Sequence, residues 1–548
     1  MGHLVFCFPQ RQSVFKSTLK KQILIIPCIY CRIMSDYLGG FSVKKVFLSL
    51  TLVLALLLTA CATSSTTGIG TTTSTQRQCA GHIDADDNGT CDLCTGSVLV
   101  TIDFYTINDL HGKIADGESH VGVDELTTYL RAKKAAGNTI LLSAGDMWQG
   151  TPESNLTQGL IITDWMNDLD FSAMVLGNHE YDWGEDAIKQ NVQVAQFPIL
   201  AINIYSRSTN QPVDYCQAST VVEMDGVQIG IIGAMGDCYS SIASDKTEDI
   251  YFKTGDALTA LVKAESQRLR TEEGVDFVVY MLHDGYGSST SSSLVDSNRI
   301  SSYYDAELST GYVDLVFEGH THQGYAFQDA YGVYHMQNRG DNSGGISFAQ
   351  LRINSVTGTY VMMDAALLSP DLYKNMADDP IVENLLNKYE DQIAPAKQVL
   401  GTNSRYRNST FLCQTVAELY YQLGLETWGD QYEITLGGGF LSCRSPYNLE
   451  AGEVRYGDLQ SIFPFDNDIV LCSVKGSDLL SKFINTENDR YYISGNWGQI
   501  DRNATYYIVV DTYTATYSYN NLTIVETYTP GIYARDLLAD YIAAGGLA

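Results

Sequence analysis

The sequence predicts an α/β (α+β) fold with two main domains, and three observations support this prediction. The chain has 548 residues, of which 45% are hydrophobic and 18% charged, so it has room for two or three folded domains and is too apolar to be disordered. Between about residues 98 and 353, apolar or β-branched runs alternate with helix-like stretches, which is typical of α/β domains. Each polar cluster in this part directly follows an apolar run, as expected where functional groups gather beyond the carboxyl ends of strands.

The expected elements of the first domain follow from this alternation. Strands are predicted at Val98–Ile107, Thr139–Ser143, Ala173–Leu176, Pro198–Ile204, Val227–Ile232, Phe277–Leu282 and Val313–Phe317. Helices are predicted at Gly122–Ala136, Gly159–Leu169, Glu185–Ala195 and Asp256–Glu272. The first domain is expected to span residues 98–372.

The second half of the chain predicts a linker and a smaller α/β domain. Met376–Gln398 has apolar residues at helical spacing, which predicts an amphipathic linker helix within residues 373–398. The remaining residues, 399–548, form the expected C-terminal domain. Its predicted elements are a helix around Gln414–Leu423, a glycine turn at Gly437–Gly439, strands near Ile469–Val474 and Thr505–Thr512, and a last helix near Tyr533–Ala544.

The N-terminal part carries an export signal. Lys44 and Lys45 precede Val46–Thr59, an apolar run too short to span a bilayer but suited to a secretion signal. The run ends in Leu-Thr-Ala-Cys, which resembles a bacterial lipoprotein box in which Cys61 receives the lipid; the alternative is an ordinary signal peptide cleaved nearby. Residues 1–33 fit no targeting pattern, so we expect the true start at Met34 and a signal peptide at 34–61. The expected location is the outer face of the bacterial cytoplasmic membrane or the cell surface.

Residues 62–97 are expected to form a flexible tether with a small module rich in Cys, His and Asp. Cys79, His82, Cys91 and Cys94 have the spacing of zinc ligands. The acidic residues between them match the first half of a calcium loop but lack its final Glu. Three interpretations of this module therefore remain: a zinc site, a calcium site, or a stalk held by disulfides without a metal ion. Five later cysteines are interpreted as mostly buried small residues: Cys216, Cys238, Cys413, Cys443 and Cys472.

The charge balance excludes some partners. The formal charge is −30, and residues 1–60 contribute seven basic residues and one acid, which leaves 27 basic and 63 acidic residues and a net charge of −36. A chain this acidic does not bind nucleic-acid polymers or anionic membranes through a basic surface, so the only expected membrane contact is the lipid anchor. An anionic substrate would need a local positive centre, which bound metal ions would supply.

Histidines and carboxylates gather at five predicted strand ends. Five of the eight histidines after the signal peptide lie in these clusters, which scattered core histidines would not do. The clusters are Asn108–Gly112, Ala144–Asp146, Gly177–Glu180, Met281–Gly285 and Gly319–His322. Asp109 and His111 are alternate residues, so both are expected to point to one side of an extended segment.

These residue types suit hydrolysis with two metal ions. Two divalent ions about 3.5–4 Å apart that share a carboxylate can hold a bridging hydroxide and clamp a phosphoryl group. Asp146, a single Asp between glycine-flanked turns, is the expected bridge. Imidazole, carboxylate and one amide oxygen suit Zn, Mn, Fe or Co, and these turns offer no thiolate.

These motifs resemble the calcineurin-like metallophosphoesterases of the bacterial 5'-nucleotidase and UDP-sugar hydrolase family. The fuller forms are TINDLHG at Thr106–Gly112, AGDMWQGTPES at Ala144–Ser154 and GNHEYDWG at Gly177–Gly184, together with His283 and Gly319–His322. The resemblance covers about residues 99–548. It implies an N-terminal four-layer metallophosphoesterase sandwich and a smaller C-terminal α/β domain that recognises substrate.

The resemblance also implies roles for individual residues. One ion would be held by Asp109, His111, Asp146 and His322, and the other by Asp146, Asn178, His283 and His320. His179 paired with Asp182 would form the catalytic dyad, since a carboxylate keeps imidazolium character on a histidine facing phosphate. The alternative role of Asp182, the N-cap of the helix at Glu185–Ala195, can hold at the same time.

The C-terminal half departs from the family pattern. The family's Gly-Gly-Gly-Ile-Arg turn contains Gly438 here, but Leu441 occupies the arginine position and Arg444 follows three residues later. The segment Phe463–Asn467 matches a family motif, which makes Phe465 the candidate ring for stacking on a base and Asn467 its neighbour. Tyr513 could supply a second ring, although the family's glycine segment after it is missing. The remaining candidates for substrate binding are Arg405 and Arg407, which are otherwise ordinary surface charges.

The implied function is two-metal hydrolysis of phosphate esters outside the cytoplasm, with nucleoside 5'-monophosphates as substrates. A UDP-sugar diphosphatase and a 2',3'-cyclic-nucleotide phosphodiesterase are the alternatives within enzymes. A catalytically dead surface binding protein is the alternative from another class. It is disfavoured because all seven expected metal ligands are present.

Overall fold

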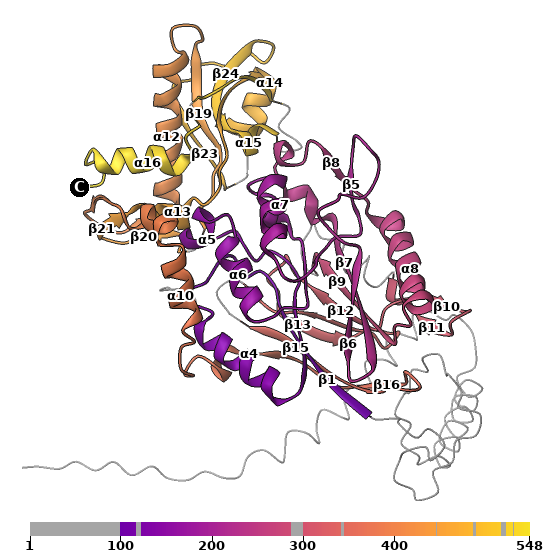
Figure 1. Cartoon of the computed structure of the whole chain (residues 1–548). Helices are drawn as coiled ribbons and strands as arrows, with labels where there is room; N and C mark the ends of the chain where they lie inside the picture. The colour runs from indigo at the N-terminus through magenta and orange to yellow at the C-terminus, as the bar shows by residue number, and fades with distance from the viewer. Residues whose placement is uncertain are drawn as a thin grey trace, which may run out of the picture. The chain divides into compact units, whose positions relative to one another are not determined.

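The computed structural model describes residues 99–116, 122–285, 300–340, 345–444, 446–485, 489–516, 522–529 and 531–548 (Figure 1). The predicted signal peptide, Cys61 and the module at Cys79–Cys94 lie outside the described residues. Within the described ranges, no helix combines the length and the apolar character needed to cross a membrane.

A six-stranded sheet carries the first three predicted site clusters. Its strand order is β16 (Tyr360–Leu368), β15 (Ile346–Asn354), β1 (Leu99–Ile107), β2 (Asn138–Ser143), β3 (Ala173–Val175) and β4 (Ile199–Leu200). The four strands β1 to β4 are parallel in sequence order, and β15 and β16 extend the sheet antiparallel. The carboxyl ends of β1, β2 and β3 therefore meet at one edge.

A second six-stranded sheet carries the other two clusters. Its order is β13 (Tyr325–Gln328), β14 (Tyr334–Gln337), β12 (Leu315–Glu318), β9 (Phe277–His283), β7 (Val227–Met235) and β6 (Ser219–Met224). The strands β7, β9, β12 and β14 are parallel, with antiparallel strands at both edges. Two short pairs lie outside the sheets: β5 (Ile204–Ser206) with β8 (Ile250–Phe252), and β10 (Tyr304–Asp305) with β11 (Thr310–Gly311).

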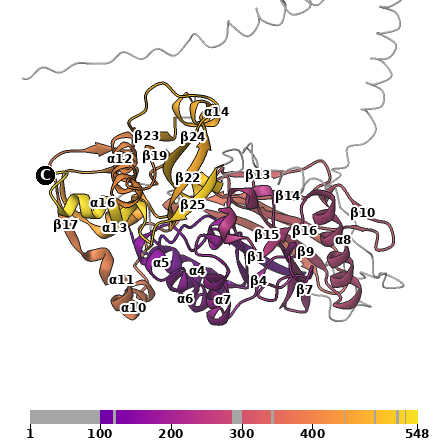
Figure 2. The same cartoon turned by 90° about the horizontal axis from the view of Figure 1, so that it is seen from above.

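The two sheets pack face to face between helices, which gives the expected four layers. Alternate residues of a strand face opposite sides. Phe104 and Phe277 meet between the sheets with ring centroids 6.1 Å apart, whereas Tyr105 and Tyr280 face the outer helices. The helices α4 (Asp124–Ala136), α6 (Leu160–Asp168) and α7 (Glu185–Val194) cover the first sheet, and α8 (Gly255–Glu272) covers the second (Figures 1 and 2). Short helices complete the domain: α5 (Pro152–Leu156), η1 (Asn178–Tyr181), η2 (Asp237–Ser241), η3 (Ser244–Lys246) and η5 (Pro370–Leu372).

Two predicted elements differ from the structure. The single strand expected at Pro198–Ile204 is divided between β4 and β5, which belong to different sheets. The single linker helix expected at Met376–Gln398 consists of α10 (Ile381–Lys388), α11 (Glu390–Ile393) and the 3₁₀ turn η6 (Ala394–Lys397). Pro380 stands at the start of α10 and Pro395 within η6, and proline cannot continue a regular helix because it lacks the N–H and clashes with the preceding turn.

The C-terminal part contains a mixed five-stranded sheet. Its order is β23 (Tyr491–Gly495), β19 (Ile434–Phe440), β24 (Thr505–Asp511), β22 (Ile469–Lys475) and β25 (Thr523–Thr527). One face packs on α12 (Ser409–Trp428) and α16 (Ala534–Ala543), and the other on α14 (Gly476–Asp478) and the π-helical turn η7 (Leu479–Ile484). The remaining elements are α13 (Tyr456–Ile462), α15 (Thr512–Thr516) and the strand pairs β17 (Val399–Asn403) with β21 (Gly452–Arg455) and β18 (Arg407–Asn408) with β20 (Asn448–Leu449).

The glycine turn predicted at Gly437–Gly439 is wrong, because all three glycines lie inside β19. A Cβ atom on Gly437 would come 2.2 Å from the backbone nitrogen of Tyr421 in α12, and one on Gly438 would come 2.1 Å from the carbonyl oxygen of Tyr492 in β23. The glycines therefore permit close packing of this strand against its neighbours rather than a change of chain direction.

Candidate active site

The seven predicted metal ligands come from the carboxyl ends of five strands in the two sheets. Asp109 and His111 follow β1, Asp146 follows β2, Asn178 follows β3, His283 ends β9, and His320 and His322 follow β12. Five of the seven have left-handed backbone conformations: Asp109, His111, Asp146, His320 and His322, with φ between 51° and 76°. Such conformations are costly for residues other than glycine and gather at functional sites.

The expected extended segment at Asp109–His111 is therefore wrong. The strand β1 ends at Ile107, and both residues lie in a tight turn rather than on alternate positions of a strand. Their side chains still reach one site because the turn is fastened to the loop after β2. The backbone N–H groups of Asp109 and His111 donate to the carbonyl oxygens of Gly145 and Asp146 at 2.9 and 3.1 Å.

The first group of ligands comprises Asp109, His111 and His322, whose donor atoms lie within 4.8 Å of one another. His111 Nε2 is 3.2 Å from His322 Nε2, and His322 Nε2 is 3.3 Å from an oxygen of Asp109. His111 Nδ1 donates to the carbonyl oxygen of Gln149 at 2.9 Å, so its Nε2 lone pair faces the group. Burial, followed by the charge of His322, lowers the pKa of His111 well below its usual value, which keeps this ring neutral.

The second group surrounds the amide oxygen of Asn178. This oxygen is 2.8 Å from His320 Nδ1 and 3.3 Å from His283 Nε2, and His283 Nε2 is 3.2 Å from an oxygen of Asp146. His283 Nδ1 donates to the carbonyl oxygen of Ala144 at 2.6 Å, which turns its Nε2 atom toward the group. Burial alone would lower the pKa of His283, but Asp146 raises it to about 10, as expected where the surroundings favour a cation.

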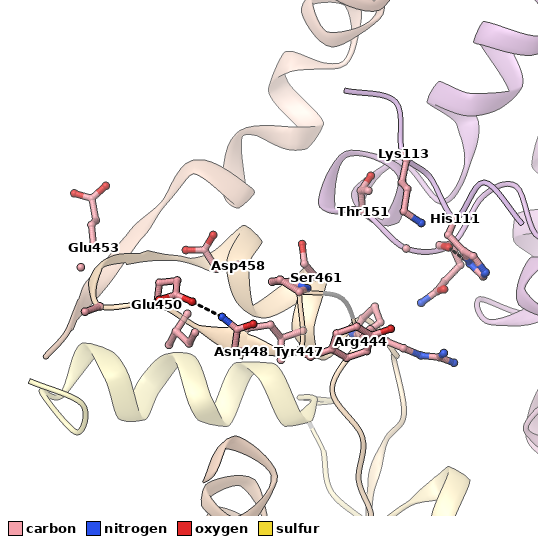
Figure 3. A pocket seen from close by; sticks show the side chains of 18 of the residues that line it. His111, Lys113, Thr151, Arg444, Tyr447, Asn448, Glu450, Glu453, Asp458 and Ser461 are labelled. Carbon is pink, nitrogen blue, oxygen red and sulfur yellow. Dashed lines mark hydrogen bonds between the residues drawn. The ribbon is translucent and has the colours of Figure 1, made fainter. Parts of the chain in front are cut away.

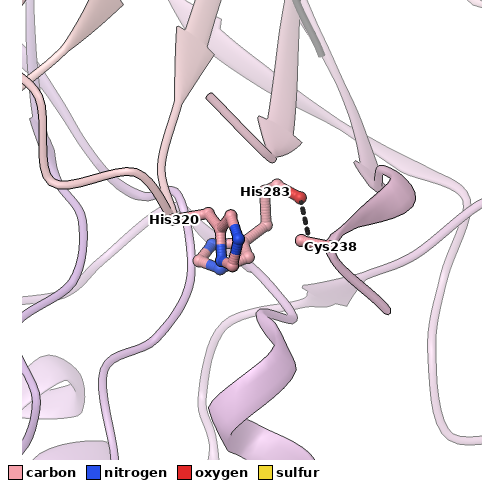
Figure 4. A group of neighbouring side chains, drawn as sticks. All are labelled: Cys238, His283 and His320. Atoms are coloured by element: carbon pink, nitrogen blue, oxygen red, sulfur yellow. Dashed lines mark hydrogen bonds between the residues drawn. The ribbon is translucent and has the colours of Figure 1, made fainter. Parts of the chain in front are cut away.

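Cys238 stands beside this second group and was not predicted as a site residue. Its sulfur lies with the rings of His283 and His320 in one set of possible ligands (Figure 4). The thiol donates to the main-chain oxygen of His283 at 2.9 Å, and burial raises its pKa well above the usual value. A thiol held in this way does not readily become a thiolate ligand. The sequence signal was weak because a single cysteine after a strand is normally a buried small residue.

The donor set fits divalent metal ions. Two pairs of possible ligand atoms face each other at 3.2–3.3 Å, His111 with His322 and His283 with Asn178. Either a shared proton or a cation can hold such pairs together, and mixed nitrogen and oxygen donors suit Zn, Mn, Fe or Co. Asp109 belongs both to the first group and to a set with Asp146 and His283, so its carboxylate lies between the two halves of the site. Sequence reasoning expected Asp146 alone to bridge them.

His179 and Asp182 form the predicted pair. His179 Nδ1 is 2.8 Å from a carboxylate oxygen of Asp182, and the His179 ring lies edge-on to the ring of His111 with centroids 5.2 Å apart. Burial would lower the pKa of His179, but the charges of Asp182 and Asp146 outweigh it and raise the pKa. The alternative role of Asp182 as a helix N-cap is wrong, because Gly184 is the N-cap of α7.

Glu180 organises the loops that carry the ligands, a role that sequence reasoning missed. Its buried carboxylate accepts hydrogen bonds from four backbone N–H groups: Asp146 at 2.9 Å, Met147 at 2.8 Å, Trp148 at 3.2 Å and Gly177 at 2.6 Å. The loop after β2 and the loop after β3 are thus fastened to one anion. The only sequence signal was its place directly after Asn178 and His179.

A cavity of about 680 Å³ opens onto this site. Its wall includes His111, Asp146, Asn178, His179, His320 and His322, and also residues of the C-terminal part. Four predicted substrate residues line it: Arg444, Phe465, Asn467 and Tyr513. The Phe465 ring stacks on His179 with centroids 5.9 Å apart, and the Arg444 guanidinium is 5.1 Å from the Phe465 centroid. Phe440, Arg490 and Tyr492 also line the cavity and were not predicted.

The other substrate candidates lie elsewhere. Gly438 is buried within β19. Arg407 packs its guanidinium on Phe411 at 4.4 Å and donates to the side chain of Asn403, and neither it nor Arg405 lines the two cavities described here.

A second cavity of about 470 Å³ shares His111, His322 and Arg444 with the first. Figure 3 labels His111, Lys113, Thr151 and Arg444 among the residues that line this second cavity. Its far wall is acidic, with Glu450, Glu453 and Asp458, and Asn448 donates to Glu450 at 2.6 Å. The basic side chains of this second cavity, Lys113 and Arg444, are those whose charges act on His111 and His179.

The chain is similar to known phosphoesterases in sequence and in fold. Residues 102–324 match the calcineurin-like phosphoesterase family. Protein UshA of Yersinia enterocolitica is 24% identical over 432 residues, which cover 71% of this chain and 75% of that protein. The 5'-nucleotidase of Diplobatis ommata is 24% identical over 69% of both chains. The structure of a 5'-nucleotidase precursor from Thermus thermophilus superimposes with a TM-score of 0.59 at 19% identity, covering 81% of this chain and 96% of the other.

The fold and the site define a metal-dependent phosphoester hydrolase. The chain contains a calcineurin-like phosphoesterase domain, is homologous to 5'-nucleotidases and to UshA, and has the expected C-terminal domain. The predicted fold class and enzyme class are confirmed.

Proposed function

We propose that the chain hydrolyses nucleoside 5'-monophosphates to nucleoside and phosphate. The observation that carries this proposal is the 680 Å³ cavity, which joins the metal ligands to aromatic and arginine side chains. The metal ligands suit the phosphate of such a substrate, and the aromatic and arginine side chains suit its nucleoside. The homology to 5'-nucleotidases supports the same substrate class.

The side chains have distinct roles in this proposal. Asp109, His111, Asp146, Asn178, His283, His320 and His322 would hold two divalent ions, which when bound polarise the phosphoryl group and lower the pKa of water. The His179 imidazolium, held by Asp182, stabilises negative charge on the phosphoryl oxygens and the leaving oxygen.

The nucleoside is proposed to lie against rings of the C-terminal part. Tyr513 and Phe440 have centroids 5.7 Å apart and share the cavity wall with Phe465, so a flat base can pack against them. Arg535 donates to the carbonyl oxygens of Phe463 and Phe465 at 3.4 and 3.1 Å, which fixes the segment carrying Phe465 and Asn467. Arg444 and Arg490 add positive charge to the wall.

Phosphate release from four substrates tests this proposal: AMP, UDP-glucose, 2',3'-cyclic AMP and p-nitrophenyl phosphate, each with and without Mn²⁺. Preference for AMP supports the nucleotidase. Preference for UDP-glucose or the cyclic nucleotide would replace it by one of the two alternative activities. Equal turnover of all four would overturn the nucleoside pocket, and no release from any would favour a dead binding protein.

We further propose that the protein acts outside the cytoplasm, anchored by a lipid on Cys61. Mass spectrometry of the membrane fraction tests this, since an unmodified N-terminal peptide would contradict it.

The proposed catalytic domain at 98–372, linker at 373–398 and C-terminal domain at 399–548 can be tested by limited proteolysis. Metal analysis of a peptide spanning Cys79–Cys94 would separate zinc, calcium and a disulfide stalk.

A further inference from the structure

Two buried cysteine side chains meet next to the segment that carries Arg444. The sulfur atoms of Cys413 and Cys443 are 3.7 Å apart, and the exposed fractions of the two residues are 1% and 8%. Both residues are reduced in this structure. A disulfide requires a sulfur–sulfur distance of about 2.05 Å, so the two sulfurs must move closer together for the bond to form.

The elements that carry the two cysteines hold them in this position. Cys413 lies in the second turn of α12, and the sulfur of Cys443 also lies 3.9 Å from the carbonyl oxygen of Ser409, one turn earlier on the same helix. The segment of Cys443 is fixed on both sides by backbone hydrogen bonds, from Leu441 to the carbonyl oxygen of Arg490 at 3.0 Å and from Arg444 to that of Ile462 at 2.9 Å. The approach of the sulfurs therefore follows from the fold.

The pair also borders the cavity at the candidate active site. Cys413 and Cys443 both line the 680 Å³ cavity, whereas Cys472 is buried on the opposite face of the C-terminal sheet. The cavity is therefore the route by which a small disulfide would approach the pair.

We propose that Cys413 and Cys443 form a disulfide that fastens the segment before Arg444 to α12. The oxidant is a disulfide, either of a thiol-oxidising protein or of a small molecule such as glutathione. The thiolate of one cysteine attacks it and forms a mixed disulfide. The second cysteine then displaces that partner, so the two cysteines lose two electrons and two protons and the oxidant becomes two thiols. The bond closes a loop between residues 30 positions apart and restricts the cavity wall at Arg444.

Peptide mapping of the full-length protein tests the proposal. The protein is incubated with glutathione disulfide, its remaining thiols are alkylated, and it is digested with and without reduction. We expect one peptide pair linking Cys413 to Cys443, which disappears on reduction, while Cys216, Cys238 and Cys472 are alkylated as free thiols in both samples. Free thiols at Cys413 and Cys443 after oxidation, or their linkage to other cysteines, would overturn the proposal.

Thermal unfolding provides a second, independent measurement. After oxidation, C413S, C443S and the double variant should each unfold roughly 5–15 °C below the wild type, with no further loss in the double variant. Reductant should lower the midpoint of the wild type and of C472S, which both retain the pair, and should leave the midpoints of C413S, C443S and the double variant unchanged. C472S is the matched control, because it also places a hydroxyl in a buried site and its effect should not depend on reductant. Additive effects of C413S and C443S, or an oxidised wild type that reductant leaves unchanged, would contradict the bond.

Discussion

The metal site and the wall of the substrate cavity are built in different ways. The candidate ligands lie in short runs at strand ends, and neighbouring groups fix several of them: the carbonyl oxygen of Gln149 orients His111, that of Ala144 orients His283, and Glu180 holds the loops. The cavity wall instead collects single side chains from separate elements, such as Phe440 at the end of β19 and Tyr513 in α15. Local sequence therefore encodes the chemistry, whereas tertiary placement decides which leaving group fits.

The largest expected effect comes from His179, which tests whether the chemistry belongs to the strand-end site. His179→Ala should lower kcat by roughly 10²–10⁴-fold for every substrate, because the imidazolium near the phosphoryl group is lost. Metal content measured by mass spectrometry should not change. Loss of metal instead would make His179 a ligand and remove it from the proposed dyad.

Glu180→Gln tests whether the network behind the ligands matters. In this variant the NH₂ of the amide replaces one carboxylate oxygen and faces two backbone N–H groups that now donate to that oxygen. Because two donors cannot form a hydrogen bond with each other, the loops after β2 and β3 should become less tightly held. We expect metal affinity to fall about 10–100-fold and excess metal to restore much of kcat. Glu223→Gln, at an exposed position of β6, is the control. Unchanged metal affinity in Glu180→Gln would contradict this role.

Tyr513→Leu tests whether the cavity wall contributes to nucleoside binding independently of the metal site. Loss of a stacking ring should cost about 1–3 kcal/mol, roughly 5- to 150-fold in kcat/KM for AMP. Turnover of p-nitrophenyl phosphate should stay within about twofold of the wild type. Tyr331→Leu removes an exposed ring from the catalytic domain and should affect neither substrate. Equal losses of activity on both substrates would mean that Tyr513 supports the folded structure and does not bind the nucleoside.

The smallest expected effect is a pH shift from Asp182→Asn. The carboxylate of Asp182 helps to raise the pKa of His179 against the effect of burial, so removing it should lower that pKa. His179 then loses its proton at lower pH, and the alkaline limb of the kcat/KM profile should move to lower pH. A profile whose alkaline limb stays in place would mean that another group sets it.

The predicted ligands of the first domain lie in contiguous motifs at strand ends, and for this reason the sequence could indicate that they meet in one place. It also predicted a helix around Gln414–Leu423, which lies within the longer α12, and a last helix near Tyr533–Ala544, which matches α16. It missed Glu180 because a carboxylate that binds backbone N–H groups has no pattern of its own, and it missed Phe440 and Arg490 because only folding brings them to the cavity. The glycines of β19 misled the prediction, since a glycine run for close packing and one for a turn are identical in sequence.

Metal dependence is the central claim, and returning metal to the chelated protein tests it most directly. The protein is stripped with a chelator, Mn²⁺ is added back in steps, and bound metal and phosphate release from AMP or p-nitrophenyl phosphate are measured together. Activity is expected to be absent in the stripped protein and to reach its maximum at about two ions per chain. Full phosphate release from protein that holds less than one ion per chain would contradict the account.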